Sequence, residues 1–195
     1  MLEWSYDYVG SEPASKAVAE RRKTKVKEYP LEGVRTHELN VLPDERGFFA
    51  EALRHDWQDF IDEWITQVNL SYSYPGMVRA WHKHTRGQVD YFLVVKGAMK
   101  ICAYDEKTKK LAEVVASGEK PTLVRIPGCY LHGTKTVSSQ PSLTVYFVTR
   151  LYDYKSPDEE RRPWNDPSIV PSEINGNKGD PRVNKPWDWF YPPHK

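Results

Sequence analysis

Two histidines separated by a single residue, His82 and His84, carry the strongest chemical signal in the sequence, and His132 follows further along the chain. If Gly76–His84 forms a strand, its side chains alternate between two faces, so His82 and His84 point to the same side. Two imidazoles on one side of a strand suit proton transfer near neutral pH or the ligation of a transition metal. Buried histidines that only satisfy hydrogen bonds in a core are the alternative, although two imidazoles from one strand in one interior are unusual for core packing. The spacing therefore indicates a candidate site and leaves its chemistry open.

Short β-strands are the elements that must position these histidines. Between residues 33 and 155, apolar and polar residues alternate over short stretches separated by turn residues, a pattern typical of antiparallel strands. We expect strands at residues 36–42, 48–53, 65–71, 77–82, 91–95, 98–104, 111–115, 122–126, 134–137 and 143–150. A tight hairpin is expected at Lys96–Gly97, a short helix around Trp57–Trp64 and a longer helix over Ala14–Lys27. This number of short strands indicates an all-β sandwich or barrel rather than a parallel α/β sheet.

The composition argues against several classes of protein. The 195 residues include 28 Lys and Arg against 27 Asp and Glu, a formal net charge of +1, whereas general nucleic-acid binders carry a basic excess. The longest apolar run, Tyr91–Val95, is far too short to span a membrane, and the first residues lack the pattern of a signal peptide. Two cysteines are too few for a disulfide framework. We therefore expect a soluble cytoplasmic protein that binds neither nucleic acid nor membrane.

Three zones follow one another along the chain. Residues 1–32 form a polar N-terminal arm, residues 33–155 the β-rich domain, and residues 156–195 a C-terminal extension rich in Pro, Asn, Asp and Gly. The extension ends in an aromatic run, Trp187–Tyr191, which would be a large adhesive patch if it were exposed. We expect this run to pack back on the β domain or on a dimer partner.

Several blocks of residues resemble known motifs. Gly76–His84 with Asp90 and Gly97 resembles the first motif of the cupin superfamily, and Pro127–Gly133 resembles the second. Within that superfamily, the chain is most similar to the dTDP-4-dehydrorhamnose 3,5-epimerase family. The blocks of that family occur in the same order over about residues 33–170: Asp44–Glu51, Gln67–Asn69, Val78–His82, Ile126–Gly133 and Tyr154–Pro167.

The resemblance implies a fold and an activity. The fold would be an all-β cupin jelly roll with short helices and terminal extensions, assembled as a homodimer. The activity would be that of an isomerase, a carbohydrate epimerase that removes the proton next to the ketone of a nucleoside-diphosphate-linked 4-keto-6-deoxyhexose. It would need neither a metal nor an organic cofactor. His82 would be the base, and His132, Lys155 or Arg79 would stabilise the enolate.

The resemblance also implies a set of substrate-binding residues, some of which reach across the dimer: Arg46, Phe49, Glu51, Gln67, Asn69 and Arg79. Arg46 and Arg79 would hold the pyrophosphate through forked hydrogen bonds, and the others would contact the base and the sugar. Each residue alone has a structural alternative, such as closing a turn at Arg46 or lining a polar sheet surface at Gln67 and Asn69. As an ordered set, they favour binding.

The sequence departs from the family where the catalytic tyrosine is expected. Counting back from Ser156–Pro157 puts Thr149 at that position, and a Thr hydroxyl is a far poorer acid than a phenol with a pKa of about 10. Tyr146 and Tyr152 lie three residues to either side, which would put them on the other face of the strand. The aspartate that orients the base is not evident, with Asp180 as the only suggestion. Epimerisation at a single carbon is therefore one alternative.

Two further functions stay open. His82, His84 and His132, together with Asp90 or Gln88, approach the three-histidine, one-carboxylate set of metal-dependent cupins. Such a set would hold Zn, Fe or Mn in an oxygenase or isomerase. The missing tyrosine also fits a non-catalytic cupin that only binds a sugar nucleotide.

Overall fold

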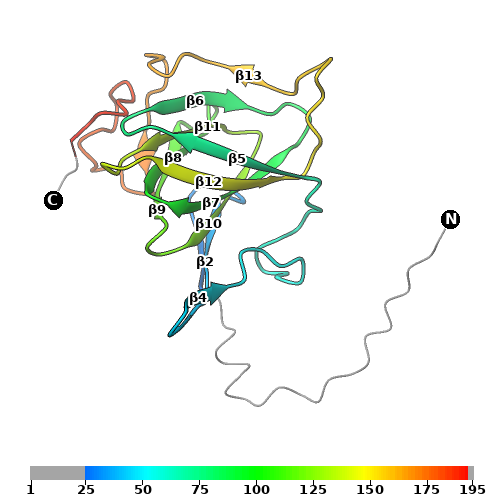
Figure 1. Ribbon diagram of the computed structural model, residues 1–195. Coiled ribbons are helices and arrows are strands. Elements are labelled where there is room, and N and C mark those ends of the chain that lie inside the picture. Colours follow the sequence, from blue (N-terminus) through cyan, green and yellow to red (C-terminus); the bar gives the residue numbers. More distant parts are fainter. Residues whose placement is uncertain (1–24, 193–195) are drawn as a thin grey trace.

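Two six-stranded sheets that face each other form the body of the protein, and a separate hairpin stands away from them (Figure 1). The structure is a computed structural model and describes residues 25–192. The first sheet has the order β1 (Lys25–Glu28), β2 (Arg35–Glu38), β10 (Thr122–Pro127), β7 (Val89–Lys96), β12 (Ser142–Val148) and β5 (Gln67–Ser73). The second has the order β13 (Glu160–Arg161), β6 (Val78–Lys83), β11 (Leu131–Thr136), β8 (Ala98–Tyr104), β9 (Lys110–Ser117) and β14 (Glu173–Ile174). The all-β jelly roll is thereby confirmed.

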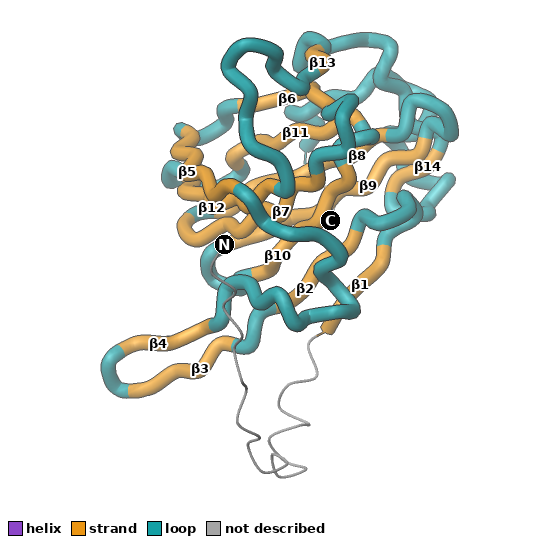
Figure 2. The backbone as a smooth tube through the Cα atoms, turned by 90° about the vertical axis from the view of Figure 1, so that its right-hand side faces the viewer, coloured by secondary structure: helices purple, strands orange, loops and turns teal. Residues whose placement is uncertain are grey.

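From β5 to β8, and again from β9 to β12, successive strands cross from one sheet to the other, which encloses an interior between them. The turn predicted at Lys96–Gly97 is present, but β7 and β8 enter different sheets, so the predicted hairpin pairing is wrong. Gly97 makes this crossing with a φ of +72°, and a Cβ atom there would lie 2.9 Å from the Pro141 carbonyl oxygen. The hairpin of β3 (Val41–Asp44) and β4 (Gly47–Ala50) pairs only with itself and projects from the body (Figure 2).

Strand β7 is buried on both faces, which explains its continuous apolar run. Its inward side chains Phe92 and Val94 join the core between the two sheets. Its outward side chains Tyr91 and Leu93 lie in a second core beneath the segment of residues 51–66. Because both faces are covered, this strand lacks the alternation of a half-exposed strand and provides a rigid support for the interior.

The C-terminal extension covers the outer side of the second sheet. Trp187 and Trp189 are buried in a cluster with Trp81 and Leu131, and the ring centroids of Trp81 and Trp189 lie 4.8 Å apart. Aromatic pairs of this kind add stabilisation beyond the area that they bury. The aromatic run therefore packs on the β domain of its own chain and supports β6, the strand that carries His82.

The helix expected around Trp57–Trp64 is absent, and residues 25–192 contain no helix at all. The chain makes one turn there, closed by the Ile61 amide on the Trp57 carbonyl oxygen at 2.8 Å. It does not continue because Glu63 turns toward the sheet and pairs with Arg125. Tertiary pairing thus ends a helical turn that the local apolar spacing favoured.

The helix expected over Ala14–Lys27 lies mostly outside the described residues. Its last residues belong to β1, which pairs with β2 in the register Val26↔His37, and the Val26 side chain packs against the core beneath residues 51–66. Hydrogen bonds to a sheet edge, together with this burial, outweigh the helix propensity of the basic segment. Within residues 25–192 there is also no helix with the length and apolar character needed to cross a membrane.

Candidate active site

A cavity of about 560 Å³ opens between the two sheets. Inward side chains of β5 and β12 line it from the first sheet, and side chains of β6 line it from the second. Residues 150–164, which we call the strap, run from the end of β12 past β13 and line the cavity as well. A cavity of this size lies within the range of small-molecule binding sites.

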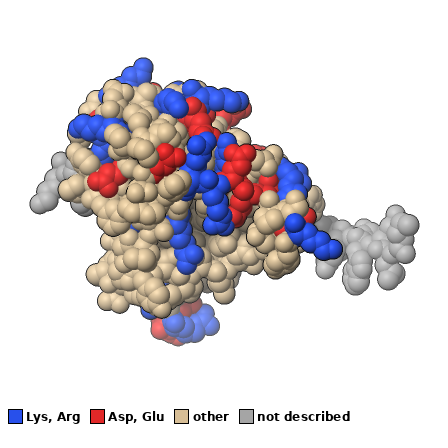
Figure 3. Space-filling view, turned by 90° about the horizontal axis from the view of Figure 1, so that it is seen from above, with Lys and Arg blue, Asp and Glu red and all other residues tan. Residues whose placement is uncertain are grey.

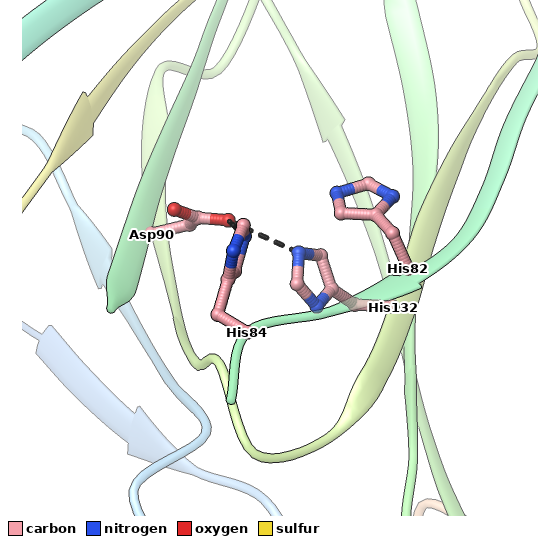
Figure 4. Close-up of side chains that lie close together, drawn as sticks. All are labelled: His82, His84, Asp90 and His132. Atoms are coloured by element: carbon pink, nitrogen blue, oxygen red, sulfur yellow. Dashed lines mark hydrogen bonds and ion pairs between the residues drawn. The ribbon is translucent and has the colours of Figure 1, made fainter. Parts of the chain in front are cut away.

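Three histidines and one aspartate lie close together (Figure 4), and all of them except His132 line the cavity. His82 is on β6 and His84 follows that strand directly, whereas His132 is on β11 and Asp90 is on β7. One nitrogen or oxygen atom of each residue lies within 4.8 Å of those of the others. Because Asp90 comes from the first sheet and the histidines from the second, the cluster forms only when the jelly roll closes.

The pairing of β6 with β11 brings two of the histidines together. His82 lies opposite His132 in the register of these strands, and their ring centroids are 4.2 Å apart. Gly133, next to His132, allows this approach, because a Cβ atom there would lie 2.2 Å from the Cβ atom of Ala80. A larger residue at this position would force the two strands apart.

Asp90 is the carboxylate at the centre of the cluster, and it is 2% exposed. Its Oδ2 lies 3.0 Å from His132 Nε2 and 3.4 Å from His84 Nε2, and its Oδ1 accepts a hydrogen bond from Gln88 at 2.7 Å. Burial alone would raise the pKa of Asp90, but the hydrogen bonds with His132 and His84 outweigh it and hold the pKa well below its usual value. The buried aspartate is therefore ionised at neutral pH.

The hydrogen bonds determine where His132 carries its proton. Its Nδ1 lies 3.0 Å from the carbonyl oxygen of Tyr130, which can only accept, so Nδ1 donates. A neutral ring would then direct the Nε2 lone pair at the Asp90 carboxylate 3.0 Å away. Lone pairs at this distance repel, so the arrangement requires a second proton on His132 or a bound cation. A histidine that ligates a metal uses its other ring nitrogen in this way, as a donor to a backbone carbonyl.

His82 differs from the other members of the cluster, because its ring makes no hydrogen bond with any of the described residues. It is half-buried and lines the cavity. Burial is the largest influence that lowers its pKa to about 2, followed by the charge that His132 can carry. His82 is therefore neutral at pH 7, with a lone pair available either for a substrate proton or for a metal.

Three of the predicted binding residues lie in the same cavity: Gln67, Asn69 and Arg79. Gln67 donates to Asn69 at 2.7 Å, and its Oε1 accepts the backbone amide of Tyr152 at 3.0 Å. The Nε of Arg79 donates to the hydroxyl of Ser73 at 3.0 Å, which orients the guanidinium group. These side chains form a polar lining from both sheets.

Four other predicted residues do not line the cavity of their own chain: Arg46, Phe49, Glu51 and Lys155. The first three lie on or directly after the β3–β4 hairpin, where Phe49 is 61% exposed. Arg46 pairs with Asp44 at 2.6 Å. Lys155 is exposed on the strap. Asp180, suggested as the partner of His82, pairs instead with Arg182 at 2.9 Å, and Asp90 is the aspartate of the cluster.

The inward face of β12 is the opposite of the one that we expected. Tyr146 lines the cavity and stacks on Phe92, with ring centroids 5.7 Å apart. The Thr149 hydroxyl instead accepts the backbone amide of Val89 at 2.9 Å, outside the cavity. Counting back from Ser156–Pro157 assigned the wrong face, because the strap between β12 and that motif is irregular. The strand's own alternation, with Thr144 and Tyr146 on one face, was the signal that could have located the phenol.

A family model and several known proteins match the chain. Residues 42–160 match the family described as "Polysaccharide biosynthesis C-terminal domain". A protein named "Probable low-salt glycan biosynthesis epimerase Agl13", from Haloferax volcanii, is 38% identical over 143 residues, which are 69% of this chain and 89% of that protein. The spore coat polysaccharide biosynthesis protein SpsL of Bacillus subtilis is 36% identical over 144 residues, 71% of this chain and 93% of that protein.

Solved structures share the fold. The dTDP-6-deoxy-D-glucose-3,5-epimerase RmlC from Legionella pneumophila, in complex with dTDP-4-keto-L-rhamnose, matches with a TM-score of 0.67 and 22% identity. The match covers 80% of this chain and 89% of that one. The jelly roll is therefore that of the dTDP-4-dehydrorhamnose 3,5-epimerases.

Proposed function

From the premise that this chain belongs to the polysaccharide biosynthesis C-terminal domain family and is related to sugar epimerases, we propose that it epimerises a nucleoside-diphosphate-linked 4-keto-6-deoxyhexose. The observation that carries the proposal is that His82 and Tyr146 line one cavity. The two side chains project from different sheets, His82 from β6 and Tyr146 from β12. An epimerase needs a base on one face of the substrate and an acid on the other.

The reaction follows from this placement. His82 takes the proton from the carbon next to the ketone, and the electrons of the broken C–H bond form the enolate. Tyr146 then gives its phenolic proton to the opposite face of the same carbon, which inverts it. The phenolate recovers a proton from solvent, and His82 releases the one that it took. No redox partner or organic cofactor is needed.

The remaining predicted residues take supporting roles in the proposal. Arg79 lies in the cavity as a cation for the phosphates or the enolate oxygen, and Gln67 and Asn69 offer hydrogen bonds to the sugar. His132 is fully buried, so it acts through Asp90 rather than on the substrate. Lys155 stays a prediction, because its exposed position on the strap places it beside the cavity but not in it.

We also propose a homodimer, because the β3–β4 hairpin carries binding residues away from its own cavity. Phe48 and Phe49 are 63% and 61% exposed at its tip, which is costly for large apolar side chains unless another surface covers them. A second copy would cover them and receive Arg46, Phe49 and Glu51 at its cavity. Sedimentation analysis tests this point, and a monomer at micromolar concentration would exclude it. We further propose a cytoplasmic location, in keeping with the free thiols of Cys102 and Cys129.

A metal-dependent isomerase is the second candidate, favoured by the geometry of the histidine cluster. His82, His84, Asp90 and His132 fit a divalent metal, because four donor atoms lie within 4.8 Å of one another and the His132 tautomer calls for a positive charge at Nε2. These donors suit Zn, Fe or Mn. A bound metal would supply a positive charge for the ketone oxygen, and His82 would then hold the metal rather than the substrate proton.

Incubation with several 4-keto-6-deoxyhexose nucleotides in D2O tests the proposed function. We expect deuterium at the carbon next to the ketone. Its absence with every nucleotide would exclude epimerisation, and thermal stabilisation by the nucleotide without deuterium uptake would indicate a non-catalytic binding protein. Elemental analysis of protein purified without chelator separates the two candidates. One metal per chain, with uptake lost on chelation and restored by metal, supports the second candidate, and full uptake by metal-free protein contradicts it.

A further inference from the structure

The strap is fastened to the histidine cluster at two points. Near its end, β13 pairs with the edge of β6, with Arg161 opposite His82, and it runs along the top of the molecule in Figure 1. Before β13, Asp158 joins the strap to the loop that follows His84. Acidic and basic side chains gather on the face seen from above (Figure 3). Asp158 also pairs with Arg86 at 3.5 Å.

The Asp158 carboxylate makes the fastening. Its Oδ1 accepts hydrogen bonds from the Thr85 amide at 2.8 Å, the Thr85 hydroxyl at 2.9 Å and the Arg86 amide at 2.9 Å. Burial would raise the pKa of Asp158, but these hydrogen bonds outweigh it and lower the pKa. An ionised carboxylate with several donors is a strong contact. Thr85, one of the two residues that it binds, is adjacent to His84 in the sequence.

The backbone carbonyl of the same residue reaches the His84 ring. His84 Nδ1 lies 2.7 Å from the Asp158 carbonyl oxygen, which can only accept, so Nδ1 carries a proton. On the other side of the ring, the amide nitrogen of Gln88 lies 3.1 Å from Nε2. Nε2 also lies 3.4 Å from Asp90 Oδ2. The contact with the Asp158 carbonyl oxygen therefore fixes a proton on Nδ1, and Nε2 faces Asp90.

We propose that Asp158 is a positioning residue, which fastens the strap through its carboxylate so that its carbonyl keeps His84 in the Nδ1–H tautomer. Strap residues also line the cavity. Asp158 therefore holds both a part of the cavity wall and the His84 ring, which faces Asp90. The inference rests on the proposed function in one respect, the inclusion of His84 in the reacting cluster. The tautomer itself is measurable without substrate.

Nuclear magnetic resonance of the whole chain labelled with 15N-histidine tests the proposal, because protonated and unprotonated ring nitrogens resonate in different ranges. Asp158→Ala removes the fastening, and Asp158→Asn keeps an oxygen that accepts from Thr85. Asp153→Ala is the matched control. Asp153 lies on the same strap and also accepts backbone amides, those of Lys155 and Ser156, so these hydrogen bonds stay within the strap.

We expect His84 to carry its proton on Nδ1 in the wild type, in Asp158→Asn and in Asp153→Ala, and to shift at least partly to Nε2–H in Asp158→Ala. The kcat of deuterium uptake should fall about 10–100-fold in Asp158→Ala, the size of effect expected from losing a hydrogen bond that orients a histidine of a reacting site, with KM little changed. An unchanged proton on His84 Nδ1 in folded Asp158→Ala, or an Nδ1 without a proton in the wild type, would overturn the proposal.

Two further comparisons keep this test decisive. If Asp158→Ala does not fold, the wild-type ring decides the proposal, because an Nδ1 without a proton there would overturn it. Thr85→Val, which keeps the two amide contacts of Asp158, should then match the wild type. If the wild type takes up no deuterium with any nucleotide, the proposed function fails, whereas the tautomer comparison still decides the role of Asp158.

Discussion

Asp90 and Tyr91 are neighbours on β7, but their side chains enter two polar clusters on opposite faces of the same sheet. The inner cluster joins Asp90 to three histidines and borders the cavity. The outer cluster joins Tyr91 to Arg125 and Glu63 beneath residues 51–66. Both contain a buried ionised group, so burial alone does not distinguish them.

The two clusters differ in how completely their polar atoms are paired. In the outer cluster, Arg125 donates to Tyr91, to Glu63 and to the Gly33 carbonyl oxygen, and Tyr91 donates to Glu63. In the inner cluster, one carboxylate serves the histidines, and the hydrogen bonds of His132 require a proton or a cation. A network whose polar atoms are all paired stabilises the fold. A network with unpaired polar atoms beside a cavity is available for chemistry.

Replacing Arg125 gives the largest expected effect on stability. Arg125→Ala leaves the Glu63 carboxylate without its cation and Tyr91 without one of its donors, which costs about 3–5 kcal/mol in the free energy of unfolding. The lower end is expected, because 29% of the Glu63 side chain is exposed. Urea denaturation measures the loss, and deuterium uptake per folded molecule should not change. The double variant Arg125→Met, Glu63→Gln should recover part of the stability. If folded Arg125→Ala lost deuterium uptake, the two clusters would not differ in function.

Replacing Asp90 should lower the activity more than the stability, the opposite of the result expected for Arg125. Asp90→Asn removes the charge that the histidines share, so we expect deuterium uptake to fall at least about 10–100-fold while the melting temperature changes less than in Arg125→Ala. Steady-state rates and calorimetry on the same samples check this. A variant with wild-type uptake would show that the inner cluster is structural.

The outer side of the sheet should also govern acid stability, through His37. This ring is fully buried and stacks on Trp57 with centroids 4.0 Å apart, and burial lowers its pKa below 6.5 although Asp59 opposes the shift. Below that pH the imidazole is protonated in the unfolded chain but not in the folded chain. The free energy of unfolding therefore decreases as the pH is lowered. Urea denaturation at pH 7 and pH 5 should show a smaller difference for His37→Phe than for the wild type. An equal difference would mean that other groups control the acid response.

The inner cluster was predictable from the sequence because its geometry follows from local rules. Alternation along a strand places His82 and His84 on one face, and the second cupin motif brings His132 to them. The side of β12 that carries Tyr146 could not be found by counting from a distant motif, since the irregular strap breaks the two-residue period. The contacts of Asp158 with His84 and Thr85 depend on where the strap folds back, which no local pattern encodes.

The central claim is that His82 and Tyr146 act on opposite faces of one substrate carbon. Deuterium content and stereochemistry at that carbon, measured after incubation in D2O, test it in the wild type, His82→Ala and Tyr146→Phe. Loss of a base or an acid costs about 10²–10⁴-fold. We predict uptake with inversion in the wild type, uptake with slowed inversion in Tyr146→Phe, and neither in folded His82→Ala. Uptake at the wild-type rate in His82→Ala would contradict the account.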